Sequence, residues 1–126
     1  MDWVSLLRAN RSLAQRLAER RTRQPAWLAL VVSQDFAGVS AHLESEHEPV
    51  EELGDYSLFP SIDDDDTVDW EDDPGRAYWE NATLGLQSLV TMEPLRAALR
   101  LVRTQSPGFR VLVWGPYDEP EQELSF

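Results

Sequence analysis

AWLALVVSQDFAGVSAHL, residues 26–43, is the stretch that decides the fold. Its first part, residues 26–33, is short, almost wholly apolar and rich in β-branched side chains, which predicts a central strand rather than a helix. Residues 33–35 are expected to turn the chain. From residue 36 to 43 apolar and polar residues alternate, so one face of the segment is apolar. The sequence therefore predicts two antiparallel strands joined by a hairpin.

Helices are predicted on both sides of this hairpin. Residues 4–22 carry apolar side chains near one face, and Pro25 closes that segment. A second helix is predicted at about residues 92–105, with Thr91 as its N-cap. Its apolar stripe follows the spacing i, i+3, i+4 and i+7 and consists of Leu95, Ala98, Leu99 and Val102.

Two more strands complete the predicted pattern, at residues 83–90 and 109–114. Residues 117–126 are expected to form a loose acidic tail, apart from two apolar side chains. The order of elements predicts an α+β fold, in which both helices pack on a largely antiparallel sheet of about four or five strands. With 126 residues, of which 42% are hydrophobic, the chain has the usual size of one domain. We therefore expect a single domain over residues 1–126.

Charge is distributed unevenly along the chain. Between Arg23 and Arg76 there is no Arg or Lys, while fifteen Asp or Glu residues occur. Most of these acids lie in residues 44–76, which we expect to be partly irregular, with some apolar side chains held to the core by short strands. The net charge of −12 repels phosphate backbones and anionic lipids and attracts basic proteins. The composition predicts a basic protein partner and disfavours direct binding to nucleic acid or membrane.

The acidic run at residues 63–73 also allows a calcium-loop interpretation. Counting from Asp65 places Trp70 at the sixth position, where a calcium loop needs Gly. His42 and His47, with glutamates around them, are a second candidate for metal binding, but the chain has no Cys and no third His. These patterns favour no metal site.

Signatures of common enzymes are absent from the sequence. No nucleophile elbow, phosphate-binding loop or dinucleotide-binding glycine motif follows a predicted strand. A carboxylate pair for glycosidase chemistry stays open, and so does a small hydrolase or metal enzyme as a third kind of function. The sequence predicts no catalytic residue, no metal ligand and no cofactor.

The first residues lack the basic leader and apolar core of a signal peptide, and a chain without Cys is compatible with a reducing cytosol. We therefore expect a cytoplasmic protein. The arginines near residues 16–23 have two interpretations: contact with RNA or DNA, or pairing with the acidic segment of the same molecule. The net charge favours pairing within the molecule.

Aromatic side chains lie next to the acidic run, a combination typical of interface anchors. A solvated acidic surface with no partner is the alternative, because charge runs are usually solvated. The candidate partner-binding residues are Asp63, Asp64, Asp65, Asp66, Asp69, Trp70, Glu71, Asp72 and Asp73, with Tyr56 and Trp79 as anchors.

The second half of the chain carries a further pattern. The run Tyr78, Trp79, Glu80, Asn81 precedes a predicted strand, Thr91 opens the predicted helix, and a strand after Pro107 closes on Trp114. Residues 78–114 in this order resemble the C-terminal half of a broad family of bacterial immunity proteins, and residues 26–43 match it more loosely.

The resemblance implies an antitoxin that binds and inhibits a cognate basic bacterial toxin, since that family neutralises polymorphic toxins, including deaminases and nucleases. The alternative is a nucleic-acid mimic, encoded by a phage or plasmid, that inhibits a DNA-binding defence enzyme. The same acidic residues would serve either function.

Overall fold

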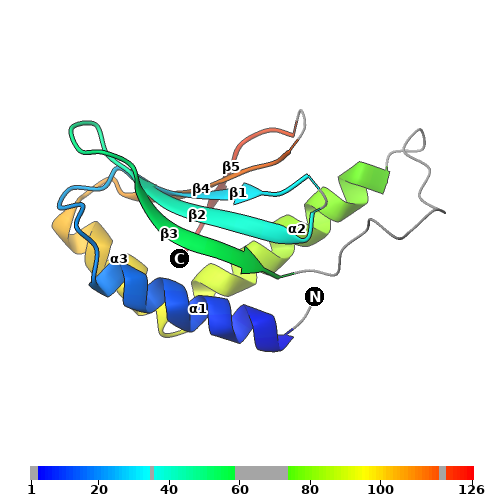
Figure 1. Ribbon diagram of the computed structural model, residues 1–126, viewed down its shortest axis with the longest axis horizontal. Coiled ribbons are helices and arrows are strands. Elements are labelled where there is room, and N and C mark those ends of the chain that lie inside the picture. Colours follow the sequence, from blue (N-terminus) through cyan, green and yellow to red (C-terminus); the bar gives the residue numbers. More distant parts are fainter. Residues whose placement is uncertain (1–2, 35, 59–73, 117–118) are drawn as a thin grey trace.

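The computed structural model describes residues 3–34, 36–58, 74–116 and 119–126, with backbone alone for residues 74–77. Figure 1 shows how the elements are arranged. Along the chain they are α1 (Trp3–Ala18), β1 (Trp27–Val32), β2 (Gly38–Glu44), β3 (Glu51–Ser57), α2 (Pro74–Thr91), α3 (Leu95–Gln105), β4 (Arg110–Trp114) and β5 (Gln122–Leu124).

In the described part of the chain, the strands form one five-stranded sheet in the order β3-β2-β1-β4-β5. The hairpin predicted from residues 26–43 is confirmed, because β1 and β2 pair antiparallel from Trp27↔Glu44 to Val32↔Val39. The apolar strand β1 is central, as predicted. It pairs parallel with β4, while β2 with β3 and β4 with β5 are antiparallel. The α+β class and the largely antiparallel sheet are confirmed.

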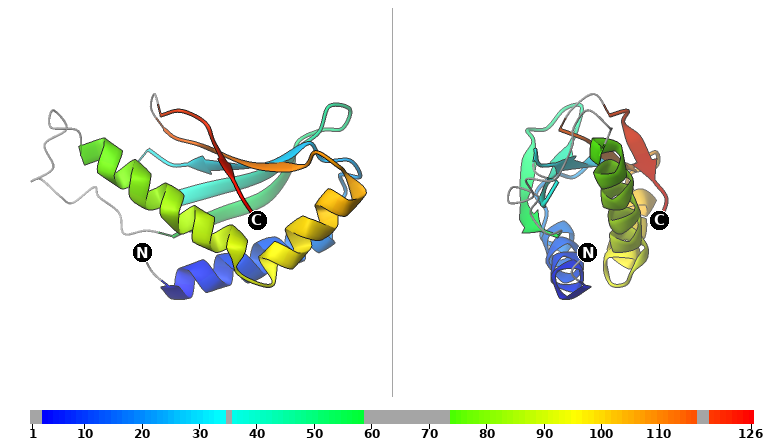
Figure 2. Two further views of the ribbon diagram at one scale, coloured as in Figure 1. Left: turned by 180° about the vertical axis from the view of Figure 1, so that it is seen from behind. Right: turned by 90° about the vertical axis from the view of Figure 1, so that its right-hand side faces the viewer.

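The three helices lie together on one side of the sheet (Figures 1 and 2). Between the two layers, apolar side chains from every helix and every strand named above form one hydrophobic cluster. Leu13, Leu30, Leu86 and Leu99 belong to it, and each is at most 1% exposed. Burying a side chain of this size stabilises the fold by about 1.5–3 kcal/mol. No helix among the described residues is both long and apolar enough to span a bilayer.

The strand predicted at residues 83–90 is wrong, because these residues belong to α2. An alternating pattern would place Leu84 and Leu86 on one face, but Leu84 is 69% exposed and Leu86 is fully buried. The buried positions recur at the spacing of a helix rather than a strand. They are Trp79, Ala82, Gly85, Leu86, Leu89 and Val90.

The predicted start of the next helix is also wrong. Thr91 is the last residue of α2, and its hydroxyl donates to the carbonyl oxygens of Gln87 (2.8 Å) and Ser88 (3.2 Å) instead of capping α3. Helix α3 begins at Leu95 and ends at Gln105. Its predicted apolar stripe is confirmed, since three of its residues are buried and the fourth packs partly against the core: Leu95, Leu99, Val102 and Ala98.

A buried side chain of α1 holds the junction between α2 and α3. Asn10 is 1% exposed, and its Nδ2 donates to the carbonyl oxygens of Leu89 (2.7 Å) and Met92 (2.9 Å). Its Oδ1 accepts a hydrogen bond from the backbone N–H of Leu95 (3.3 Å). Helix ends leave backbone groups without intrahelical partners, and Asn10 bonds to two of them, the Leu89 carbonyl and the Leu95 N–H. The Met92 carbonyl between the helices also accepts from the Arg96 N–H (3.0 Å).

The expectation of a loose tail is wrong for residues 119–126. Strand β5 pairs antiparallel with β4, and Leu124 is 4% exposed. The ring of Phe126 lies 6.2 Å from that of Phe109, and the Arg103 guanidinium is 3.9 Å from the Phe126 ring centroid. The two apolar side chains of an otherwise acidic segment therefore attach it to the sheet and to α3.

The acidic segment 44–76 contains β3 and the first residues of α2, so the short strand expected within it is confirmed. Leu53 and Leu58 attach this segment to the core, each 1% exposed. The pairing of β2 with β3 shifts by one residue at a bulge, where Gly54 has a φ of +120°. Glycine adopts that conformation without a steric cost, which allows the bulge.

Candidate functional site

The side of the sheet that is turned away from the helices is called the open face below (Figure 1). Residues paired in register point to the same side of a sheet, so Trp27 lies on this face between Glu44 of β2 and Arg110 of β4. No helix of the described chain covers it. The open face consists of Trp27, Ala29, Val31, Ser40, His42, Glu44, Glu52, Asp55, Arg110, Leu112, Trp114 and Glu123.

The centre of the open face is apolar. Ala29 and Leu112 pair across β1 and β4, and they are buried although neither belongs to the hydrophobic cluster under the helices. Trp27 and Val31 flank Ala29 on β1, and Trp114 is in register with Val31; these three side chains are half-buried. Partly exposed aromatic and aliphatic side chains on an uncovered sheet indicate a binding surface.

Carboxylates lie toward the outer strands of the open face. Glu44 and Asp55 lie on β2 and β3, and Glu123 lies on β5 at the other edge. Asp55 Oδ1 accepts a hydrogen bond from the Ser40 hydroxyl (2.6 Å), and Glu123 Oε1 is 3.4 Å from Arg110 Nη1. The acidic groups therefore border the apolar centre on both sides, as polar rims do in protein interfaces.

Glu44 ties the acidic border to the apolar centre. Its Oε2 accepts a hydrogen bond of 2.6 Å from the indole Nε1 of Trp27. The same oxygen is 3.4 Å from His42 Nε2. The first contact joins β1 to β2 and the second lies within β2, so the orientation of the Trp27 ring is fixed by the sheet and by this carboxylate.

At the end of the sheet, the loop between β2 and β3 is attached to residues 21–24, which follow α1. The Glu51 carboxylate accepts from the backbone N–H groups of Arg21 (2.9 Å) and Thr22 (2.8 Å) and from the Thr22 hydroxyl (2.8 Å). Glu48 accepts from the N–H groups of Arg23 and Gln24, both at 3.0 Å. We call this set of contacts the carboxylate clasp.

The clasp explains why α1 ends at Ala18 instead of residue 22, because the N–H groups of residues 21–24 bond to carboxylates rather than to the helix. The pKa of Glu48 is below its ordinary value because the N–H groups of Arg23 and Gln24 stabilise the carboxylate. Burial raises the pKa of Glu51, but the hydrogen bonds from Thr22 and Arg21 outweigh burial and leave it lowered.

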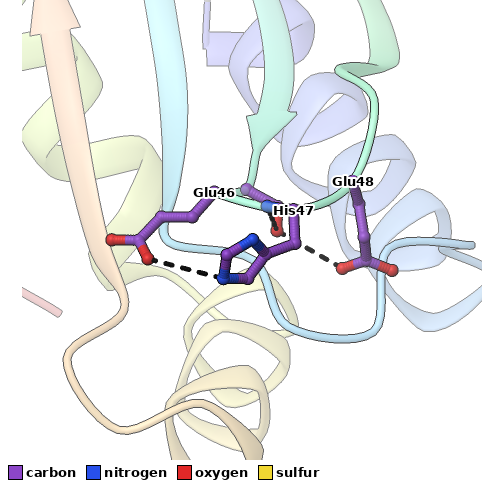
Figure 3. A network of polar contacts seen from close by, with 4 residues as sticks. Glu46, His47 and Glu48 are labelled. Atoms are coloured by element: carbon purple, nitrogen blue, oxygen red, sulfur yellow. Dashed lines mark hydrogen bonds and ion pairs between the residues drawn. The ribbon is translucent and has the colours of Figure 1, made fainter.

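Figure 3 shows the tip of this loop, with Glu46 and Glu48 on either side of His47. His47 Nε2 is 3.9 Å from Glu46 Oε2, and Glu48 is directed toward the clasp and accepts from the Ser45 hydroxyl (3.4 Å). His42 lies on the open face instead, so the two histidines contact different glutamates. Among the described residues, no group of three His, Asp or Glu side chains is arranged to hold a metal ion.

Two clefts of about 480 and 340 Å³ lie beside the clasp. They share Arg21, Val50 and Glu51 in their lining, so each contains both signs of charge. The Glu51 carboxylate in both clefts already accepts hydrogen bonds from the chain itself.

The arginines after α1 make several contacts within the molecule. Arg20 Nη1 donates to the carbonyl oxygen of Leu17 (2.8 Å), and Nη2 donates to Gln105 at the end of α3. The clasp joins this region to the acidic segment through backbone N–H groups rather than through guanidinium groups. Pairing of the arginine side chains themselves with the acidic segment stays a prediction.

Most of the predicted partner-binding residues, Asp63–Asp66, Asp69 and Trp70–Asp73, lie outside the described residues. Trp79 is 5% exposed and belongs to the hydrophobic cluster, so it offers almost no surface to a partner. The Tyr56 hydroxyl donates to the Leu53 carbonyl (2.9 Å) and shares a hydrogen bond with Ser12 (3.0 Å). Trp79 is therefore part of the core, whereas Tyr56 is half-buried and its role as an anchor stays a prediction.

No known protein family, curated protein or solved structure matches this chain. The candidate site therefore depends on geometry alone. Sequence reasoning missed Trp27 and Trp114 as partly exposed aromatics, because an apolar run shows no difference between the two faces of a strand. The signal that was available is the alternation of side chains along a strand, which places Trp27, Ala29 and Val31 on one face and Leu28, Leu30 and Val32 on the other.

Proposed function

We propose that this protein is an antitoxin: it binds a cognate basic bacterial toxin and inhibits it through an acidic surface that contains aromatic side chains. The observation that carries the proposal is the open face, where Trp27, Val31 and Trp114 lie inside a border of carboxylates. Tryptophan at the centre of a patch with a polar rim is typical of residues that dominate binding energy in protein interfaces. This function needs no catalytic residue, metal or cofactor in the chain.

Charge supports a basic partner. The open face carries four carboxylates and the Arg110 guanidinium, within a chain of net charge −12. Electrostatic fields of opposite sign on two proteins accelerate their association, and a negative field disfavours acidic partners. The toxin as partner and the cytoplasm as the place of action are proposed from the sequence resemblance of residues 78–114 to immunity proteins. In the structure, α2 replaces the short strand and the Thr91 helix start of that pattern. An enzyme that acts on nucleic acid carries the basic surface that such an inhibitor requires.

A nucleic-acid mimic that blocks a DNA-binding enzyme is the alternative. A mimic needs carboxylates spread across its contact surface at the positions of phosphates. The open face instead places them at the border and has Trp27, Val31 and Trp114 in the middle. This arrangement favours a partner with an apolar contact patch of its own over a partner that is recognised by charge alone.

The test starts with capture of partners from the source lysate on the tagged wild-type protein at low salt, with elution by raised salt and identification by mass. The same capture is made with Trp114→Ala and with Leu84→Ala. Leu84 is a matched control because it is 69% exposed on α2, on the helix side of the sheet. A basic toxin that is captured by wild type and Leu84→Ala, and lost with Trp114→Ala, supports the proposal.

A DNA-processing enzyme captured in place of a toxin would establish mimicry. Equal capture by the Trp114→Ala and Leu84→Ala variants would remove the open face from the interface. The predicted role of the acidic run is tested by replacing Asp63–Asp66 with Asn. If that run steers the toxin, association slows at low salt while dissociation is unchanged. An unchanged association rate would exclude the run from the interface.

A further inference from the structure

Trp27 and Glu44 lie side by side on the open face, so one chemical group of a partner can contact both side chains. The two residues are directly opposite in the β1–β2 register, so both side chains point away from the helices. The indole N–H donates to Glu44 Oε2 at 2.6 Å, which fixes the ring in the sheet. The indole N–H is thereby satisfied, and what the half-buried ring still offers to a partner is its carbon surface.

Glu44 retains binding capacity beside that ring. Its two contacts among the described residues, with Trp27 and with His42, both use Oε2. Its side chain is 30% exposed, and Oε1 makes no hydrogen bond or ion pair with the described residues. An aromatic surface next to an available carboxylate oxygen attracts a cation from two directions.

The neighbouring charged side chains of the sheet do not occupy the position beside the Trp27 ring and Glu44 Oε1. Arg110 of β4 is in register with Trp27, on the side of β1 opposite to β2. Its Nη1 is 3.4 Å from Glu123 Oε1 on the edge strand β5. Among the described residues, the recorded cation–π contact is a different one, in which Arg103 lies 3.9 Å from the Phe126 ring centroid. Glu52 is in register with His42 and adds a second carboxylate to the side of Glu44.

We infer that Trp27 and Glu44 form a seat for one arginine side chain of the protein partner, an inference that rests on the proposed function. The guanidinium would stack on the indole and donate to Glu44 Oε1. Arginine fits better than lysine because its planar group stacks and donates hydrogen bonds at the same time, whereas an ammonium group is compact and more strongly hydrated. Because the Trp27–Glu44 hydrogen bond already orients the ring, little ordering is needed on binding.

The test uses two probes of equal charge, hexa-arginine and hexa-lysine peptides, titrated at low salt into the whole labelled protein. The readout is the set of indole N–H resonances from the five tryptophans, with Trp27 assigned from the Trp27→Phe variant. We expect hexa-arginine to shift the Trp27 resonance saturably and to bind at least about threefold more tightly than hexa-lysine.

Glu44→Gln is the decisive variant, and Glu80→Gln is its control, because Glu80 is exposed on α2 and its replacement removes the same charge. Loss of a charge-assisted hydrogen bond predicts about 10-fold weaker hexa-arginine binding by Glu44→Gln and less than about twofold by Glu80→Gln. Equal losses in both variants, equal binding of both peptides, or a shift of another indole without Trp27 would each overturn the inference.

Trp27→Phe keeps an aromatic surface but has no N–H group, so it separates folding from recognition. An unperturbed amide spectrum with weaker hexa-arginine binding is the expected result, and unchanged binding would contradict a role for the indole. The proposed function is judged separately by capture of the natural partner. If Glu44→Gln behaves as its control while Trp114→Ala still loses the toxin, the seat is refuted and the antitoxin proposal stands.

Discussion

Replacing Asn10 with alanine tests the reasoning about the fold most sharply. Asn10 is 1% exposed and bonds to the carbonyl oxygens of Leu89 and Met92 and to the N–H of Leu95. The variant leaves the Leu89 carbonyl and the Leu95 N–H without this partner at a buried junction, while the Met92 carbonyl keeps its hydrogen bond from the Arg96 N–H. Each buried group that loses its hydrogen bond costs about 1–3 kcal/mol, and alanine recovers about 0.5 kcal/mol through its higher helix propensity.

Partial relaxation and entry of water reduce this total, so we expect Asn10→Ala to lower the free energy of unfolding by about 3 kcal/mol. For a chain of 126 residues, that loss corresponds to a melting temperature about 10 °C lower. Urea unfolding followed by circular dichroism gives the free energy directly. Asn81→Ala, at an exposed position of α2, is the control and should change stability by less than about 0.5 kcal/mol. A loss below about 1 kcal/mol for Asn10→Ala would refute the assigned role.

Three further variants test other parts of the structure. Leu99→Ala removes a fully buried side chain of α3 and should cost about 2–5 kcal/mol in urea unfolding; a cost near zero would contradict the assigned helix face. Glu51→Gln weakens the carboxylate clasp: since the folded-state pKa of Glu51 is lowered from 4.5, its contribution is present above about pH 4.5 and is lost as the pH falls through the folded value. Melting temperatures measured from pH 7 to pH 3 should therefore fall less steeply in this variant, and parallel curves would argue against the clasp. Phe126→Ala removes the ring contacts with Arg103 and Phe109, should cost about 1–3 kcal/mol, and should raise amide exchange in β5; unchanged exchange would show that β5 is held without it.

The elements that sequence reasoning predicted correctly have a clear local signal. Residues 36–43 and the apolar stripe of α3 are periodic and define a face, while residues 26–33 and 109–114 are short apolar runs of strand length. Residues 83–90 were misassigned because Leu84 and Leu86 match a period of two over a short window. Only the longer run from Trp79 to Val90 shows the helical spacing that burial then confirms.

The candidate site was harder to predict, for a different reason. The sequence identified acidic residues beside aromatic ones and a basic partner as the matching chemistry, and these stay predictions. It placed the anchors at Tyr56 and Trp79, which the structure uses in hydrogen bonding and in the core. A residue's local pattern does not say which side of a sheet the helices will cover, and that choice decides whether an aromatic ring is core or surface.

What the sequence determined by itself is the class of fold, the central position of β1 and the acidic field, because these follow from composition and from patterns of a few neighbouring residues. Tertiary structure alone decided that β4 lies parallel beside β1, that Asn10 joins three helices and that Trp27 meets Glu44. The first two depend on residues far apart in the chain, such as the 85 positions between Asn10 and Leu95, so their contact free energies appear only when the whole chain is packed. The third joins residues 17 positions apart and depends on the register that the β1–β2 hairpin adopts in the sheet.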